Sequence, residues 1–173
     1  MKYIGLLRGI NVGGNKPIDM SKLKEFFESL GYKDVRTYIN SGNIFFDSSK
    51  KAADIQKEVF VNLKKVYGWE IPALVRTVKD MRRIAKAIPK DWQNDDTYKT
   101  DVAYLFDEID SRNIIDELPV NKEFVDIRYV KGALFWHVAR KHYNKSRINK
   151  LIGHNAYTLM TIRNVNTARA LAQ

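Results

Sequence analysis

The sequence predicts an α+β protein made of two ferredoxin-like subdomains, each with a split β-α-β core and a mainly antiparallel sheet. Apolar residues recur at helical spacing in some segments and form short β-rich runs in others. The element order strand-helix-strand-strand-helix-strand occurs in residues 1–90 and again in residues 101–173, and the polar, turn-rich connector 91–100 separates the two. No residue-by-residue repeat links the halves, so the duplication is inferred from element order alone.

In the first subdomain, residues 3–8 predict a strand, and a loop rich in Gly and Asn follows it. Asp19 is the expected N-cap of a helix. The apolar residues of that helix have the spacing i, i+3, i+4, i+7: Leu23, Phe26, Phe27 and Leu30. The runs 34–39 and 43–47 flank Asn40-Ser41-Gly42 and predict a hairpin.

Ser48 or Ser49 is the expected N-cap of a second helix, which ends at Gly68. Its inward residues would be Ile55, Val59, Leu63 and Val66. Pro72 predicts that residues 70–76 form an edge strand. Thr77 begins a capping-box pattern, and Pro89 ends the helix that follows it.

The second subdomain repeats this order with weaker signals. The predicted elements are a strand at 101–106, a helix capped by Asp107 with Ile114, Ile115 and Leu118, strands at 123–130 and 133–140, a short helix after Ser146 with Ile148, Leu151 and Ile152, a strand at 157–161 and a helix at 164–172.

Composition limits the class of protein. Of the 173 residues, 45% are hydrophobic, which is enough for a globular core. The absence of cysteine excludes disulfides and thiol catalysis and fits a reducing cytoplasm. The apolar run before Arg8 is too short for a signal peptide, and no stretch is long enough to cross a bilayer. We therefore expect a cytoplasmic protein without a membrane partner.

The predicted topology brings two polar segments to one edge of the first sheet. The first two strands of a split β-α-β unit run parallel, so the loop after strand one and the turn after strand two lie side by side. Glycine-rich backbone, a helix N-terminus and cationic side chains can together bind an anion. The candidate ligand-binding residues here are Arg8, Gly9, Asn11, Gly13, Gly14, Lys16, Asn40, Ser41, Gly42 and Asn43.

An equally supported interpretation needs no ligand. The glycines would serve tight backbone geometry and the asparagines would cap exposed turns. The glycine pattern is neither GxGxxG nor a P-loop.

A second polar cluster spans Thr161 to Thr167. Arg163 could bind a phosphate or carboxylate bidentately, and Asn164 or Thr161 could cap the last helix. Capping with a surface arginine explains the spacing more simply, so the cluster is a weaker candidate site.

Other chemistry is sparse. His137, His142 and His154 lack metal-ligand spacing, and no metal site is expected. His137 is better explained as a satisfied core or groove residue. No catalytic triad, carboxylate pair or cofactor motif is present, so catalytic residues, cofactor and enzymatic activity stay unassigned.

Charge is distributed unevenly. Residues 1–90 hold 18 Lys/Arg and 9 Asp/Glu, residues 91–126 hold 3 and 11, and residues 127–173 hold 9 and none. The basic blocks could bind nucleic acid. Alternatively, they form a solvated face, or the last block packs on the acidic middle block.

The segments LLRGINVGGNK, TYINSGNIFF and TIRNVNT together resemble the bacterial family called domain of unknown function 1697. The resemblance covers nearly the whole chain and implies a two-subdomain α+β protein without an established activity. The motif positions that carry over are those of the first-sheet edge except Lys16, together with Arg163, Asn164 and Thr167. This chain has Val165 where the family often has an aromatic residue before the second Asn of the last motif.

Three hypotheses follow. The first is a cytoplasmic binder of a small phosphorylated or carboxylated ligand at the edge formed by residues 8–16 and 40–43. The second is a nucleic-acid-binding protein that uses the basic first and last blocks. The third is an interaction module or homodimer without catalysis. The sequence leaves the ligand and the oligomeric state open.

Overall fold

The computed structural model describes residues 1–13 and 17–173. The chain divides into two compact units, Met1–Val78 and Lys79–Gln173. Each unit contains one four-stranded antiparallel sheet. Helix α3 (Val78–Ala87), which the sequence analysis assigned to the first subdomain, is grouped almost entirely with the second unit.

The first unit has the split β-α-β topology that the sequence predicts. Its elements are β1 (Lys2–Leu7), α1 (Met20–Ser29), β2 (Lys33–Tyr38), β3 (Asn43–Asp47), α2 (Ala52–Tyr67) and β4 (Ala73–Thr77). The strand order is β2-β3-β1-β4. Because β1 and β2 both pair antiparallel with β3, they run parallel to each other on either side of it. Strand β4 lies at an edge, directly after Pro72.

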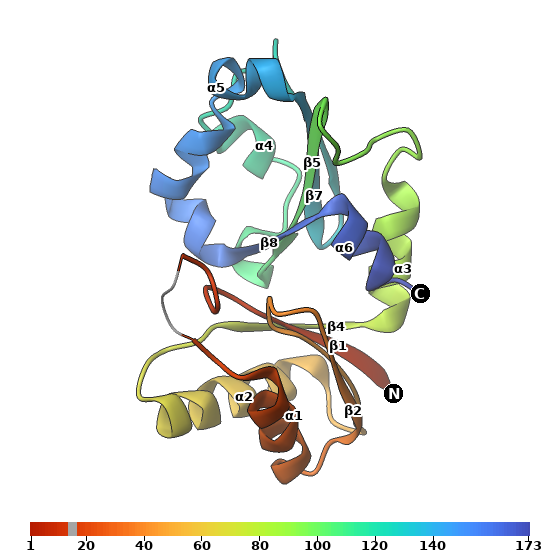
Figure 1. Ribbon diagram of the computed structural model, residues 1–173, viewed down its shortest axis with the longest axis vertical. Coiled ribbons are helices and arrows are strands. Elements are labelled where there is room, and N and C mark those ends of the chain that lie inside the picture. Colours follow the sequence, from red (N-terminus) through yellow and green to blue (C-terminus); the bar gives the residue numbers. More distant parts are fainter. Residues whose placement is uncertain (14–16) are drawn as a thin grey trace. The chain divides into compact units, whose positions relative to one another are not determined.

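Helices α1 and α2 cover one face of this sheet (Figure 1). An aromatic cluster packs between these helices and the sheet. The centroid of the Phe46 ring of β3 lies 5.3 Å from that of Phe27 and 4.8 Å from that of Tyr32. Two predictions for α2 are wrong. Lys51, not a serine, is the N-cap residue and its side chain makes no capping bond, and Val66 is 63% exposed.

The second unit repeats the strand order. Its strands are β5 (Tyr98–Leu105), β6 (Asp126–Val130), β7 (Ala133–Ala139) and β8 (Met160–Asn164), arranged β6-β7-β5-β8. Its helices after α3 are short: α4 (Ile114–Glu117), α5 (Tyr143–Ser146) and α6 (Val165–Ala170). Helices α3 and α6 lie beside each other (Figure 1), and Arg169 of α6 donates to the carbonyl of Pro89 at 3.0 Å.

The sequence overestimates helix around residues 107–118. Only a 3-10 turn at Asp107–Ile109 and one turn of α4 form there. Between them, the Asp110 carboxylate accepts hydrogen bonds from the Gly132 N–H (2.7 Å) and the Tyr129 hydroxyl (3.0 Å). Because these bonds tie the segment to the β6–β7 turn, a continuous helix capped by Asp107 does not form.

The last strand begins three residues later than predicted. Residues Asn155–Leu159 form a 3-10 turn, and the His154 side chain accepts from the Ala156 N–H at its start. The core of the second unit includes Leu134 and Trp136 of β7. It also includes Ile148 and Leu151 of a 3-10 helix at Ile148–Gly153. No helix within the described residues has both the length and the apolar character needed to span a membrane.

Candidate functional site

The loop after β1 and the turn after β2 lie side by side, as the topology predicts. The Leu7 N–H donates to the carbonyl of Gly42 at 2.8 Å. Gly42 has φ = +74°, and a Cβ there would lie 2.7 Å from the Cδ1 atom of Ile10. The turn therefore needs glycine for two reasons: its left-handed backbone and its close approach to the loop.

Asn11 holds this edge together. Its amide nitrogen donates to the carbonyl of Ile18 (2.9 Å) and to the carbonyl and side-chain oxygens of Asn40 (both 3.0 Å). Its Oδ1 atom accepts from the Ile18 N–H at 2.7 Å. The side chain thus joins the loop to the approach of α1 and to the turn after β2, which is a structural role rather than a ligand contact.

Asn43 and Ser41 also bond within the protein. Asn43 is fully buried, and its amide donates to the Tyr38 carbonyl (3.1 Å) and the Ser41 hydroxyl (2.9 Å). Of Asn11, Asn40 and Asn43, the asparagines predicted at this edge, only Asn40 is exposed. For Asn11 and Asn43, the side-chain bonds agree with the turn-capping interpretation.

The N-terminus of α1 is already occupied. Asp19 is its N-cap, as predicted, and one carboxylate oxygen accepts from the N–H groups of Ser21 (2.8 Å) and Lys22 (3.0 Å). These bonds consume donors that were expected to face an anion, and the carboxylate adds negative charge. The helix terminus is therefore no part of the candidate anion site.

What remains accessible is the backbone of the loop itself. Gly9, Asn11 and Gly13 have φ values of +71°, +54° and +62°. The residue before each of them, Arg8, Ile10 and Val12 respectively, does not have a positive φ. Alternating backbone handedness turns successive N–H groups toward one side, which forms a concave anion-binding nest. Gly9 and Gly13 are exposed, so their N–H groups are candidates for contact with a ligand. Gly14 and Lys16 lie outside the described residues.

The C-terminal motif belongs to the second unit. Asn164 caps α6 by accepting from the Thr167 N–H at 2.9 Å. Arg163 is only 9% exposed, and it donates to the Thr161 hydroxyl (3.0 Å) and the Ile162 carbonyl (2.8 Å). Burial lowers the pKa of the Arg163 guanidinium to about 10, and nearby Tyr104 opposes that effect. This arginine is thus a buried residue and not the surface arginine that was expected.

His137 stands in an aromatic stack whose full extent the sequence did not reveal. Its ring lies between those of Tyr98 (centroid distance 4.5 Å) and Trp92 (5.0 Å), and the Arg128 guanidinium covers Trp92 at 4.6 Å. Strand alternation placed His137 and Phe135 on one face. Trp92 comes from the connector, however, and no local pattern links it to β7.

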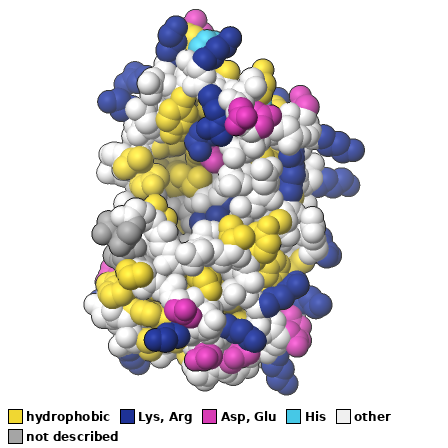
Figure 2. Space-filling model, in the orientation of Figure 1, with side chains coloured by type: hydrophobic (Ala, Val, Ile, Leu, Met, Phe, Trp, Pro, Cys, Tyr) yellow, Lys and Arg dark blue, Asp and Glu magenta, His cyan; other side chains and the backbone are white. Residues whose placement is uncertain are grey.

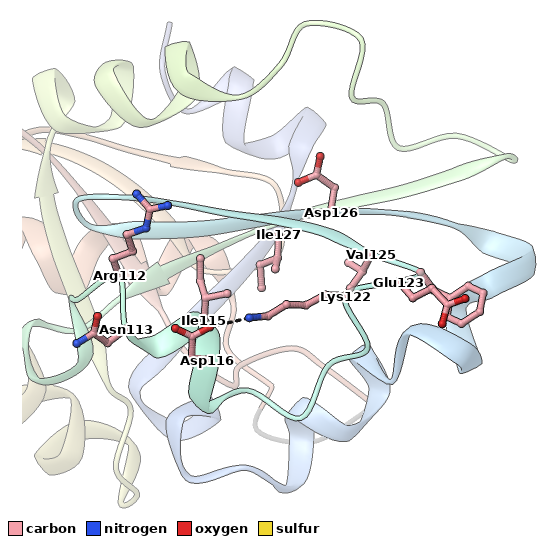
Figure 3. A pocket seen from close by; sticks show the side chains of 10 residues that line it. Arg112, Asn113, Ile115, Asp116, Lys122, Glu123, Val125, Asp126 and Ile127 are labelled. Carbon is pink, nitrogen blue, oxygen red and sulfur yellow. Dashed lines mark hydrogen bonds and ion pairs between the residues drawn. The ribbon is translucent and has the colours of Figure 1, made fainter.

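Two cavities lie elsewhere. A groove of about 650 Å³ runs beside the free edge of β6 and α4 (Figure 3). Its lining mixes both charges, with Lys122 bonded to Asp116 at 2.6 Å. A cavity of about 330 Å³ in the first unit is lined in part by Tyr32 and Lys50. Neither cavity is lined by the 8–13 loop or the 40–43 turn.

Lys50 and Tyr32 both bond the Glu58 carboxylate, Lys50 at 2.7 Å to each oxygen. These bonds, that of Lys50 above all, lower the pKa of Glu58. The described residues contain no cluster of three or more His, Asp, Glu or Cys side chains that could hold a metal.

Comparisons with known proteins agree with the architecture. The profile of a family described as protein of unknown function (DUF1697) matches residues 1–136. The chain is similar to a solved structure, a conserved bacterial protein from Streptococcus pneumoniae, with 27% identity and a TM-score of 0.86. The alignment covers 99% of this chain and 97% of that one. No curated protein matches. The family profile includes both loop motifs of the first unit but ends before the motif at residues 161–167.

Proposed function

The chain belongs to the DUF1697 family of proteins of unknown function. Because membership of this family implies no activity, we propose a function from the geometry of the site. The first unit binds a small phosphorylated or carboxylated molecule on the loop after β1. The anion would rest on backbone N–H groups of residues 9–13. Arg8 would add positive charge beside them. The proposal assigns binding and leaves any reaction open.

One observation carries this proposal: the loop alternates left-handed residues with residues of ordinary φ from Arg8 to Gly13. Fixing glycine residues in one left-handed conformation costs conformational entropy on folding. The alternation makes successive N–H groups converge on one point, where they can bind an anion. Asn11 adopts the left-handed conformation without being glycine, and its side chain secures it through Ile18 and Asn40. Residues 8–13 are thus held in shape without a ligand, which lowers the entropic cost of binding.

The roles of the polar residues change accordingly. The amides of Asn11 and Asn43 shape the edge from within, so they support the ligand site indirectly. Arg8 is half-buried and its N–H donates to the Pro72 carbonyl at 2.9 Å, which fixes the start of the loop against β4. Among the described residues of the loop, Arg8 is the one proposed to supply positive charge.

The test is an NMR titration of the full chain with inorganic phosphate and with acetate, against chloride at matched ionic strength. We expect saturable shifts in the amide signals of Gly9 and residues 11–13. Because a charge-assisted hydrogen bond contributes about 1.5 to 3 kcal/mol, Arg8→Gln should weaken binding roughly tenfold to a hundredfold.

Arg36→Gln is the matched control. Arg36 is an exposed arginine of the same unit, and its guanidinium covers Phe45 at 4.4 Å. The Arg36→Gln variant loses one positive charge, as Arg8→Gln does, but at a position outside the 8–13 loop. Shifts scattered over the surface, or equal weakening by the two variants, would show a general charge effect and reject the site.

A further inference from the structure

The segment Arg140–Lys150, called here the basic strip, carries five cationic side chains in eleven residues. They are Arg140, Lys141, Lys145, Arg147 and Lys150, and all five are exposed. The last acidic residue of the chain is Asp126, so the strip contains no carboxylate of its own. Figure 2 shows Lys and Arg side chains on both sides of a His side chain at the end of the second unit that carries α5, with one acidic group among them.

The backbone of the basic strip is anchored to the core of the second unit. Ile148 and Leu151 are 4% and 2% exposed, and Ser146 is fully buried. The Ser146 hydroxyl donates to the Tyr143 carbonyl (2.6 Å), and the Ser146 carbonyl accepts from the Asn121 N–H (2.8 Å). The apolar residues point inward and the cations outward, so the positive surface is held in place by the fold.

The acidic block does not neutralise this surface. Its carboxylates pair near their own positions: Asp116 with Lys122, Asp126 with Arg128, and Asp101 with Lys99. Arg140 is the exception, because it contacts the acidic block: its side chain donates to the Asp95 carbonyl and the Asn94 side chain, and its N–H donates to the Thr97 carbonyl. Hydrogen bonds from the backbone lower the pKa of Asp95 most, and the charge of Arg140 also helps to lower it. In the part of the chain that the structure describes, Lys141, Lys145, Arg147 and Lys150 form no ion pair.

Arg147 occupies a position that would suit glycine. It ends α5 with φ = +60°, where a side chain costs about 1 kcal/mol or more relative to glycine. The Arg147 N–H donates to the Asn144 carbonyl, and the Arg147 carbonyl accepts from the Lys150 N–H. Glycine would therefore adopt this backbone conformation at lower cost than the arginine that this chain has there.

We propose that the basic strip binds the phosphodiester backbone of a nucleic acid. Lys and Arg side chains without an ion-pair partner, with interspersed amides, here Asn144 and Asn149, provide donors for phosphate oxygens. Among these cations, the Lys145 ammonium lies 5.5 Å from the centroid of the Phe124 ring. A membrane surface fits less well, because binding in its interface needs an apolar face that is free to insert. Here Ile148 and Leu151 are used by the protein's own core, and only Ile152 is left exposed.

The proposal makes a quantitative statement about salt. If four unpaired cations contact phosphates, the logarithm of the association constant falls with the logarithm of salt concentration, with a slope of about −3 to −4. Each contact removed lowers the magnitude of that slope by about one. At about 0.1 M salt, each lost contact weakens binding roughly five- to tenfold.

The experiment measures fluorescence anisotropy of labelled single-stranded RNA and duplex DNA of about 20 nucleotides with the full chain over a series of KCl concentrations. The variant is Arg147→Gly with Lys150→Ala. Because glycine relieves the left-handed backbone, this variant should keep or raise the melting temperature. It should nevertheless weaken binding roughly 25- to 100-fold and reduce the slope by about two.

Lys57→Ala with Lys65→Ala is the matched control. Both lysines are exposed on α2 of the first unit, and the change removes the same charge. The control should weaken binding less than threefold. Equal weakening by the two double variants would mean that net charge alone attracts the probe, and would overturn the proposal.

Two further outcomes would also overturn it. One is the absence of binding at about 50 mM KCl, where phosphate contacts are strong. The other is binding to vesicles of anionic phospholipid without binding to either nucleic acid, which would assign the strip to a membrane surface.

The phosphate titration of the first-unit loop, repeated on the Arg147→Gly/Lys150→Ala variant, should be unchanged, so the two proposals fail independently.

Discussion

At the scale of single residues, the edge of the first sheet shows how a conspicuous motif can serve structure and leave binding to the backbone. Asn11 makes bonds to Ile18 and Asn40, and Asn43 bonds across its own turn. Gly42 permits the contact of the turn with Leu7 and Ile10. The side chains that make the motif recognisable thus hold a loop whose exposed chemistry is its N–H groups.

Gly42→Ala should destabilise the protein by roughly 2 to 4 kcal/mol, because it adds left-handed strain and overpacking together. Its Cβ would meet Ile10 at 2.7 Å and Leu7 at 2.9 Å. Gly9→Ala is the control, since Gly9 also has positive φ but no atom within 4 Å of its Cβ position. It should cost only about 1 kcal/mol. Urea unfolding of the two variants separates strain from packing, and equal losses would contradict the packing argument.

His137 has a defined tautomer in this structure. The Thr100 hydroxyl donates its only proton to the Gln93 carbonyl, and it also lies 2.7 Å from the Nδ1 atom of His137. Nδ1 must therefore donate to Thr100, and Nε2 carries no proton in the neutral ring. A nitrogen NMR spectrum showing the Nε2–H form instead would contradict this assignment.

The same histidine predicts a pH dependence. Burial lowers the pKa of His137 below its ordinary 6.5, although Asp91, Asp126 and Asp95 oppose the shift. Between the lowered folded pKa and 6.5 the unfolded chain binds more protons, so the free energy of unfolding falls as pH drops through that window. In urea unfolding between about pH 7 and pH 5, His137→Asn should lose less stability than the wild type. An identical pH profile would show that His137 does not contribute.

At the scale of elements, helix prediction succeeded where short-range signals agree. In α1, the periodic residues Leu23, Phe26 and Phe27 are buried and Asp19 caps the helix, both as predicted. At residues 107–118 the same kind of pattern was misleading. Asp110 bonds Gly132 and Tyr129, which are about twenty residues away, and these bonds replace a helical turn.

Asp19→Ala should cost about 1 kcal/mol, because two N–H groups of α1 lose their acceptor. Asp19→Asn keeps an N-cap oxygen and should retain most of the stability. Thermal unfolding of both variants measures the difference. If Asp19→Asn loses as much as Asp19→Ala, then the charge, rather than the hydrogen bonds, is what stabilises the helix.

At the scale of the whole molecule, two sheets with the same strand order carry unlike sequences and unlike surfaces. The orders β2-β3-β1-β4 and β6-β7-β5-β8 are equivalent. In the first unit the described part of the loop after β1, residues 8–13, contains three left-handed residues, whereas in the second unit only Phe106 separates β5 from Asp107 and Glu108. The second unit instead carries the basic strip. The two proposals therefore assign different anions to different units.

The pattern of charge along the chain gains its meaning only from the fold. The sequence alone left open whether the basic last block packs on the acidic middle block. In the second unit, some cations of the last block form ion pairs with the acidic block and others do not. Arg128 pairs with Asp126, while Lys141, Lys145 and Lys150 form no ion pair with any described carboxylate.

The sequence by itself determined the class of fold, the order of the strands, the hairpin turns and two helix N-caps, Asp19 and Asn164. These features depend on interactions between residues within about four positions of each other, together with the alternation of apolar residues, and both can be seen in a single chain. The neighbourhood of the 8–13 loop and the 40–43 turn also followed, because strand direction alone places them at one edge.

Only the tertiary structure decided which polar groups face solvent and which bond within the protein. Asn11 meets Asn40 across 29 positions and His137 meets Thr100 across 37. Arg163 is only 9% exposed, although its sequence context favours a surface arginine. A polar side chain is stabilised equally by water or by an internal partner of suitable geometry. Its role therefore depends on distant segments that the fold brings within hydrogen-bonding distance.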